Sequence, residues 1–267
     1  MGSMENLIAL CKWPDLPEKY ALALRQAVAF ILERYAVSGI IASGTIIRGS
    51  PDPASDLDIY VVHRAGFRQR VQKFFNDVPA EIFVNPPQAI EGYLKEEQAE
   101  RRPLTAHMLA TGFVILERDP VVGQLREKAG NLLANPPGAP RDLTYQRYMA
   151  ALLYEDALDI QERDPEAAEM ILQRAVVEMM NFCFIQAGAF MPRSKSLIAE
   201  FSKAHPATGE LARSFYREAS LVKKIALAGQ IADQTIGRRG FFEWEATPEE
   251  VGKLSNETNS GESPGAA

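Results

Sequence analysis

Two aspartates separated by one residue, Asp56 and Asp58, open an apolar run that continues to residue 62. In a β-strand, residues two apart point to the same face, with about 6–7 Å between their backbones. Aspartate is depleted in strands, so two of them at the start of an apolar strand indicate a function. Carboxylate oxygens suit Mg²⁺, which keeps several waters and completes its coordination with substrate phosphates. The spacing predicts a metal site; the alternative interpretation is a turn cap followed by a solvated strand residue.

A glycine and a hydroxyl residue, Gly44 and Thr45, close the preceding apolar run. In a Gly–Thr turn, backbone N–H groups and the Thr45 hydroxyl would lie where a triphosphate can bind. Arg48 follows within one turn's length and could also reach a phosphate. A solvated arginine is an equal alternative at that position.

The stretch from residue 44 to residue 62 resembles the signature of the DNA polymerase beta-type nucleotidyltransferase superfamily. That signature consists of a Gly-Ser or Gly-Thr pair, a linker and Asp-x-Asp, which Gly44-Thr45 and Asp56-Leu57-Asp58 match. A second register beginning at Gly49 leaves only residues 51–55 before the first aspartate, which is too short. The Gly44 register has the customary spacing, although threonine stands where serine is commoner.

The resemblance implies a reaction in which an acceptor hydroxyl attacks the α-phosphate of a nucleoside triphosphate and releases pyrophosphate. Two Mg²⁺ ions on Asp56, Asp58 and a third acidic residue would stabilise the attacking and leaving oxygens. Thr45 and nearby N–H groups, with Gly44 and Arg48, would hold the phosphates. We expect the pKa of a carboxylate clustered with two others to be raised unless metal is bound.

The third acidic residue and a second-domain lysine are further candidates. Glu81 is the only acidic residue inside a predicted strand after Asp58, and the resemblance assigns it to metal binding or to the base that accepts the hydroxyl proton, without deciding which. An exposed strand-edge glutamate is the alternative. Lys195 follows Pro192 and resembles the phosphate-contacting lysine of antibiotic nucleotidyltransferases that have a helical second domain. A solvated lysine at a helix start is equally compatible with the sequence.

Composition excludes several protein classes. The 267 residues are 46% hydrophobic and 24% charged, as in a soluble globular protein of one or two domains. A formal net charge of −6 argues against sequence-independent nucleic-acid binding, which needs dense lysine and arginine. Two cysteines predict neither a disulfide framework nor a zinc site and favour the cytoplasm. The sequence contains no P-loop, no Gly-x-Gly-x-x-Gly motif and no apolar run long enough for a membrane span.

The pattern of elements predicts an α/β (α+β) domain with a small mixed sheet, followed by an all-α helical bundle. Proline and glycine between residues 135 and 140 mark a boundary. We therefore predict a catalytic domain over 1–140, a bundle over 141–245 that frames the acceptor and nucleotide, and a disordered tail over 246–267. The expected strands are 38–43, 58–63, 80–85 and 113–116. The expected helices are 17–35, 67–76, 104–111, 142–163, 166–187, 194–205 and 211–236.

The leading hypothesis is a Mg²⁺-dependent enzyme that uses ATP, or another nucleoside triphosphate, to place a nucleoside monophosphate on a hydroxyl of a small molecule. The resemblance favours AMP and an aminoglycoside-like or lincosamide-like antibiotic, and a monomer or homodimer is expected. One alternative is modification of a protein or tRNA, as in toxin–antitoxin systems. A non-catalytic nucleotide-binding protein is the other.

Overall fold

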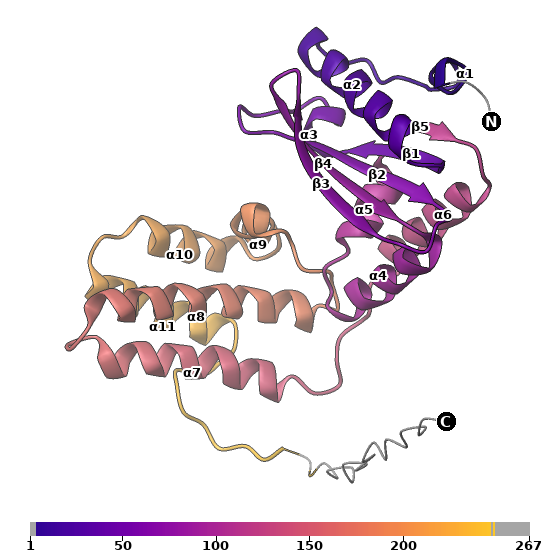
Figure 1. Ribbon diagram of the computed structural model, residues 1–267. Coiled ribbons are helices and arrows are strands. Elements are labelled where there is room, and N and C mark those ends of the chain that lie inside the picture. The colour runs from indigo at the N-terminus through magenta and orange to yellow at the C-terminus, as the bar shows by residue number, and fades with distance from the viewer. Residues whose placement is uncertain (1–3, 247, 249–267) are drawn as a thin grey trace, which may run out of the picture.

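The computed structural model describes residues 4–246 and 248 of the chain. A mixed five-stranded sheet with helices on both faces is followed by a region built of helices alone (Figure 1). This architecture confirms the predicted fold class. Within the described residues, no helix is both long and apolar enough to cross a membrane.

The sheet has the strand order β3-β4-β2-β1-β5. Neighbouring strands are antiparallel, except that β2 and β4 run parallel. All seven residues of β1 are buried, as expected for a strand covered on both faces. The strands are β1 (Val37–Ser43), β2 (Leu57–His63), β3 (Gln69–Phe75), β4 (Val78–Asn85) and β5 (Phe113–Glu117).

The edge strand β3 corrects the prediction of a helix over residues 67–76. Asn76 and Asp77 both have positive φ, 46° and 58°, and form a two-residue connection between β3 and β4. Two consecutive positive φ values match the right-handed twist of a hairpin, and Asn and Asp tolerate them best among non-glycine residues. Most of β3 is polar and exposed, as suits an edge strand, and its apolar residues imitate helical spacing.

Helices cover the two faces of the sheet separately (Figure 1). Helix α2 (Glu18–Arg34) packs on one face, where Ala27 and Ile31 share a core with Ile59. On the other face Leu109 and Val122 join a second core with Tyr60. The helices of that face are α4 (Pro87–Ala99), α5 (Leu104–Thr111) and α6 (Val121–Ala134); the short helices α1 (Met4–Ala9) and α3 (Gly44–Ile47) complete the region.

Helices α4 and α6 lie where no element was predicted. Pro86 and Pro87 indicate the end of a strand, but Pro87 is also the first residue of α4. Proline is tolerated at the first helical position because its missing N–H would have no partner there. Residues 44–47 likewise form one helical turn where the sequence predicts a turn outside regular structure.

The helical region has a core of its own, in which α7 and α8 pack along their length and α11 packs on both. Its elements are α7 (Thr144–Ile160), α8 (Pro165–Gln186), the 3-10 turn η1 (Ser194–Ser196), α9 (Leu197–Ala204), α10 (Pro206–Arg217) and α11 (Leu221–Gln234). The prediction of a single helix over 211–236 is wrong, because residues 218–220 interrupt the helix between α10 and α11. There the Glu218 carboxylate accepts the N–H groups of Ala219 and Ser220, both at 2.9 Å, in place of helical bonds.

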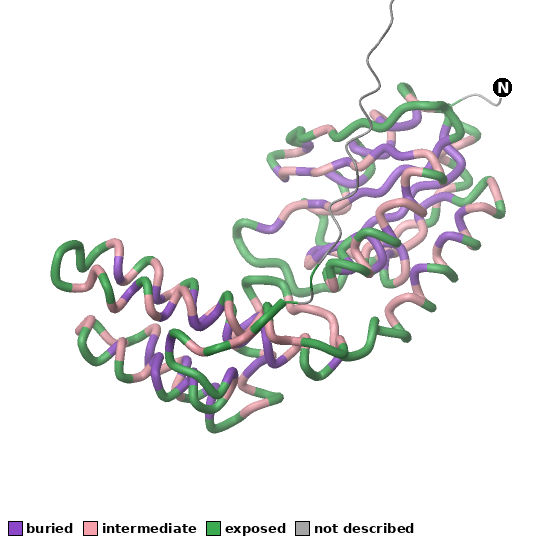
Figure 2. The backbone as a smooth tube through the Cα atoms, turned by 90° about the horizontal axis from the view of Figure 1, so that it is seen from below, coloured by how far each residue is buried: buried purple, intermediate pink, exposed green. Residues whose placement is uncertain are grey.

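The two regions bury separate sets of residues. The cores of the sheet region end before residue 134, and the core of the helical region begins after residue 142. Figure 2 shows buried residues in both regions. This separation agrees with the proposed boundary near residue 140, and the limits 1–140 and 141–245 remain a proposal. The predicted tail over 246–267 lies, except for residues 246 and 248, outside the described residues.

Candidate metal centre

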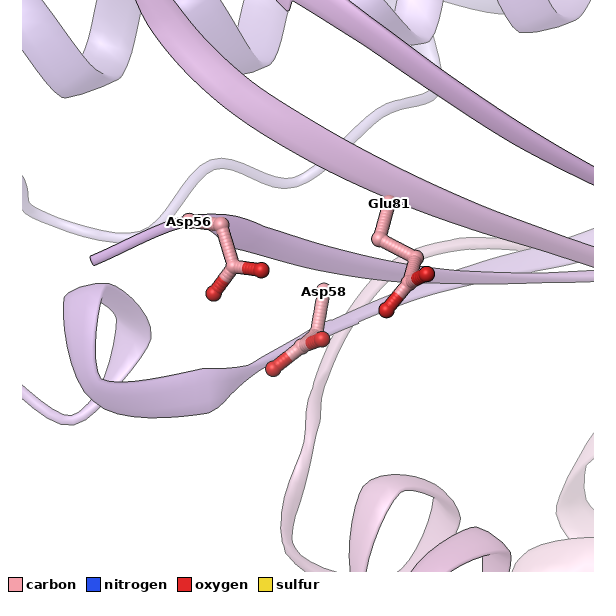
Figure 3. Close-up of side chains that lie close together, drawn as sticks. All are labelled: Asp56, Asp58 and Glu81. Atoms are coloured by element: carbon pink, nitrogen blue, oxygen red, sulfur yellow. The ribbon is translucent and has the colours of Figure 1, made fainter. Parts of the chain in front are cut away.

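Strand register brings the predicted carboxylates together. Asp58 in β2 is the direct partner of Glu81 in the parallel strand β4, so both side chains stand on one face. Asp56 precedes β2 by one residue and points the same way (Figure 3). One carboxylate oxygen from each of the three residues lies within 4.8 Å of the other two. We call Asp56, Asp58 and Glu81 the acidic triad.

The triad lies on the same face of the sheet as the core residues Tyr60 and Val62. Asp58 alternates along β2 with Tyr60 and Val62, which are buried against the helices of the same face. Tyr60 stacks on Phe83 of β4, with ring centroids 5.9 Å apart. Both strands therefore contribute apolar residues to the core beyond the triad, while Asp58 stands near the start of β2 and Glu81 in the first half of β4.

Gly44 packs directly on Asp58. Its φ of +92° is a value that side-chain-bearing residues rarely adopt, and a Cβ at this position would lie 2.8 Å from Asp58 Oδ2. Both observations require glycine. The Gly44 backbone therefore forms one wall of the triad.

The Thr45 hydroxyl already has a hydrogen-bond partner, in the linker between α3 and Asp56. Its Oγ1 lies 2.8 Å from Ser55 Oγ, which also accepts the Asp52 N–H at 2.9 Å. These bonds tie α3 to the residue just before Asp56. The predicted phosphate contact of Thr45 remains a proposal: the Thr45 hydroxyl can accept a hydrogen bond from Ser55 and still donate its own proton to a phosphate.

Glu81 is held by two residues of β3. Its Oε1 accepts the Gln72 Nε2 amide at 2.8 Å and pairs with the Arg70 guanidinium, which also lies over the Phe83 ring at 5.1 Å. Gln72 is the register partner of Glu81, and the Glu81 side chain is 14% exposed. The ion pair and the hydrogen bond fix the Glu81 carboxylate beside Asp58.

Electrostatics set Asp58 apart. Burial, together with the negative charges of Asp56 and Glu81, raises the pKa of Asp58 to about 6 from 3.8. This is the shift expected for clustered carboxylates without a cation. Three hard oxygen donors at this spacing fit Mg²⁺ in their chemistry, and a divalent ion would stabilise their charged forms.

Positive groups from two segments also act on this site. The charges of Arg193 and Arg48 both lower the pKa of Asp58, and both lower the pKa of His107 on α5 after the larger effect of burial. Arg48 ends α3, and Arg193 precedes η1 in the helical region. The triad therefore faces cationic groups suited to polyphosphate.

Of the cations in this loop, Arg193 is the one whose charge acts on Asp58. Lys195 is exposed in η1, and among the described residues no hydrogen bond or ion pair joins it to the triad. From the sequence, Pro192 indicates a loop before η1, but it does not indicate which cation of that loop acts on the triad. Arg70 and Gln72 were also missed, since the sequence signal for β3 was interpreted as a helix.

A cavity of about 700 Å³ lies elsewhere, between α7 and residues 240–245. Its lining includes Tyr148, Glu155, Asp159 and Trp244, and none of the triad. This cavity is therefore separate from the acidic triad.

Comparisons with known proteins add little. No protein-family model matches the sequence, and no curated protein matches it. Among solved structures, a nucleotidyltransferase-like protein from Exiguobacterium sibiricum 255-15 is similar at 15% identity and a TM-score of 0.49, over 80% of this chain and 73% of that one. A likeness at this level carries no argument about activity. Any inference about activity therefore depends on the geometry of the site.

Proposed function

We propose that the chain is a Mg²⁺-dependent nucleotidyltransferase that moves a nucleoside monophosphate, AMP from ATP, onto a hydroxyl of a small molecule. The observation that carries the proposal is the acidic triad, assembled from two parallel strands and packed on Gly44. The Gly-Thr and Asp-x-Asp residues that resemble the superfamily signature thus lie beside one another. The cations Arg48 and Arg193 on the same site agree with a triphosphate.

Each residue has a role in this proposal. Bound Mg²⁺ would supply Lewis-acid stabilisation of the attacking and leaving oxygens. Asp56 and Asp58 would hold the metal, and Glu81 would join them. We assign Glu81 to metal binding and not to proton transfer, because Arg70 and Gln72 already engage its Oε1.

The bond changes follow from the reaction class. The acceptor oxygen forms a bond to the α-phosphorus, and the bond from that phosphorus to the pyrophosphate oxygen breaks. The hydroxyl proton leaves to a triad aspartate or to water. Arg48 and Arg193 would neutralise charge on the departing pyrophosphate, a role suited to guanidinium groups.

The charge of the chain bears on the choice of acceptor. A net charge of −6 favours a cationic or neutral small molecule, such as an aminoglycoside-like compound, over nucleic acid. The similarity to antibiotic-modifying enzymes depended partly on Lys195, and in the present proposal Arg193 takes its place.

Pyrophosphate release provides the test. The purified chain would be incubated with Mg²⁺, each of the four nucleoside triphosphates labelled at the α-phosphate, and a panel of hydroxyl-bearing acceptors that includes aminoglycosides. We expect label on a small molecule, abolished by Asp58→Asn and unaffected by Asp15→Asn, an exposed aspartate outside the site. Label on a protein or tRNA would favour the alternative substrates. Binding of ATP without turnover on any acceptor would favour a non-catalytic protein.

A further inference from the structure

Three separated segments meet at Arg101, in the connection between α4 and α5. Its guanidinium donates to Gly138 O at 2.6 Å and to Ala189 O at 3.4 Å. Its own carbonyl accepts the Met191 N–H at 2.8 Å. One residue of the sheet region therefore bonds both to the segment that leads into α7 and to the loop that follows α8.

The backbone around Arg101 is specialised for this contact. Arg101 has a φ of +60°, a conformation unfavourable for a residue with a side chain. Gly188 has a φ of +71°, and a Cβ there would lie 2.6 Å from Ala139 N and from Gly138 C. The loop and the connecting segment thus touch through their backbones, and glycine at position 101 would suit the backbone better than arginine. The arginine side chain must therefore contribute something that the backbone conformation does not require.

The held loop leads directly to the candidate site. Met191, whose N–H bonds to Arg101, lies two residues before Arg193. Arg193 is exposed and makes no hydrogen bond or ion pair through its side chain among the described residues, so its place depends on the loop that carries it. Its charge nevertheless acts on both Asp58 and His107.

We propose that Arg101 is a positioning residue, which holds residues 188–193 against the sheet region and thereby keeps the Arg193 guanidinium within electrostatic range of the acidic triad. The inference deepens the proposed function, since it relies on that function for the anion that Arg193 would contact, a nucleoside triphosphate. Arg101 itself is not placed in contact with substrate.

This role has consequences of opposite sign for two ligands. A guanidinium beside three carboxylates repels a free divalent cation but attracts the phosphates of a metal–nucleotide complex. If Arg193 is no longer held near the triad, Mn²⁺ alone should therefore bind more tightly and MgATP should bind more weakly. General destabilisation of the fold would weaken both.

The experiment compares four variants of the full chain. Arg101→Gly removes the side chain and suits the positive φ, so it should fold. Arg101→Lys keeps the charge but has a single donor nitrogen in place of the two guanidinium nitrogens that contact Gly138 and Ala189. Arg193→Ala removes the proposed partner. Arg102→Ala is the matched control, an exposed neighbouring arginine whose side chain makes no hydrogen bond or ion pair within the described residues.

We expect Arg101→Gly and Arg193→Ala each to lower the Kd of Mn²⁺ about threefold and to raise that of MgATP about tenfold. Arg101→Lys should fall between wild type and Arg101→Gly, and Arg102→Ala should match wild type. In the Arg193→Ala background, Arg101→Gly should have no further effect on either ligand, because it acts through Arg193. Hydrogen exchange of the Met191 amide should be faster in Arg101→Gly than in Arg102→Ala.

The outcomes separate the two proposals. Unchanged Mn²⁺ binding and unchanged Met191 exchange in Arg101→Gly would overturn the positioning role, even if wild type binds MgATP and turns over. Weaker binding of both ligands in Arg101→Gly would also overturn it. Conversely, a wild type that binds Mn²⁺ but no nucleotide would refute the proposed function, while the Mn²⁺ shift and Met191 exchange would still support the positioning role. A wild type that binds neither would overturn both.

Discussion

In the sheet region, Asp58 is half-buried beside two other carboxylates, whereas in the helical region the buried Lys224 ammonium pairs with the single carboxylate of Glu169. Lys224 is 6% exposed, and it also lies 5.6 Å from the centroid of the Phe215 ring. The two regions therefore differ in whether a buried charge has a counter-ion: Lys224 has one, and Asp58 lies among like charges. A buried charge with its counter-ion is a structural element, while a cluster of like charges costs stability and indicates a function.

The largest expected effect tests the functional half of that comparison. Asp58→Asn preserves shape but removes the charge central to the triad, so kcat/KM for pyrophosphate release should fall by at least about 10³-fold. Glu169→Gln in the helical region should leave kcat/KM within about twofold of wild type because it lies outside the site. Equal losses in the two variants would contradict the division of roles.

The contact of Gly44 with Asp58 can be isolated with a second glycine. Gly44→Ala should lower the free energy of unfolding by about 2–3 kcal/mol and weaken Mn²⁺ binding, because it adds both backbone strain and a clash. Gly49→Ala is the matched control, with a φ of +75° but no atom within 4 Å of the added Cβ, and should cost about 1 kcal/mol with Mn²⁺ binding retained. Urea denaturation and Mn²⁺ titration measure the two effects. Similar values for both variants would show that the carboxylate moves aside freely.

The structural half of the comparison concerns Glu169, whose pKa is lowered mainly by its hydrogen bond to Lys224. Glu169→Gln leaves a buried ammonium without its counter-ion and should lower the free energy of unfolding at pH 7 by about 2 kcal/mol. Because a lowered carboxyl pKa stabilises the fold above the unfolded value of 4.5, this deficit should begin to shrink as the pH falls below 4.5 and should be lost as the pH falls through the lowered pKa of the folded chain. Glu200→Gln breaks the exposed pair with Lys203 and should cost under about 0.5 kcal/mol. A deficit that persists unchanged at pH 3.5 would argue against the charge pair.

For the triad, we expect the stability of the metal-free chain to depend on pH with the opposite sign. The raised pKa of Asp58 means that the folded, metal-free chain binds its proton more tightly than the unfolded chain, so stability falls as the pH rises from 3.8 to about 6 and stays low above it. Asp58→Asn should therefore stabilise the metal-free chain by about 1–2 kcal/mol at pH 7.5, and by less at pH 4. Urea denaturation in a chelator measures this difference. A destabilised variant at pH 7.5 would show that the carboxylate is compensated in the fold.

The smallest expected effect distinguishes two cations of one loop. Lys195→Ala should change the Kd of MgATP by less than about twofold, since the charge of this loop that acts on Asp58 is that of Arg193. Arg193→Ala should raise it about tenfold. Isothermal titration calorimetry can measure both. The reverse order would restore Lys195 as the phosphate ligand.

Much of the fold follows from local pattern, and the failures share one cause. Helices with long apolar stripes, such as α2 and α8, were predicted within about two residues of their observed ends. Strand β3 was mistaken for a helix because its polar residues face solvent at the sheet edge, where no core imposes alternation. Helix α4 was missed because Pro87, which can begin a helix, was interpreted only as a strand end.

The sequence by itself determined that Asp56 and Asp58 share a face, because the two-residue period of a strand is a local property of the backbone. It also determined the change from a mixed sheet to helices near residue 140. Only the tertiary structure decided that Glu81 stands next to Asp58, since that depends on parallel pairing of β2 with β4. The contact of Gly44 with Asp58 and the approach of Arg193 likewise require segments distant in sequence to meet. Spacing along the chain contains no direct information on such meetings, which are set by the packing of whole strands and helices.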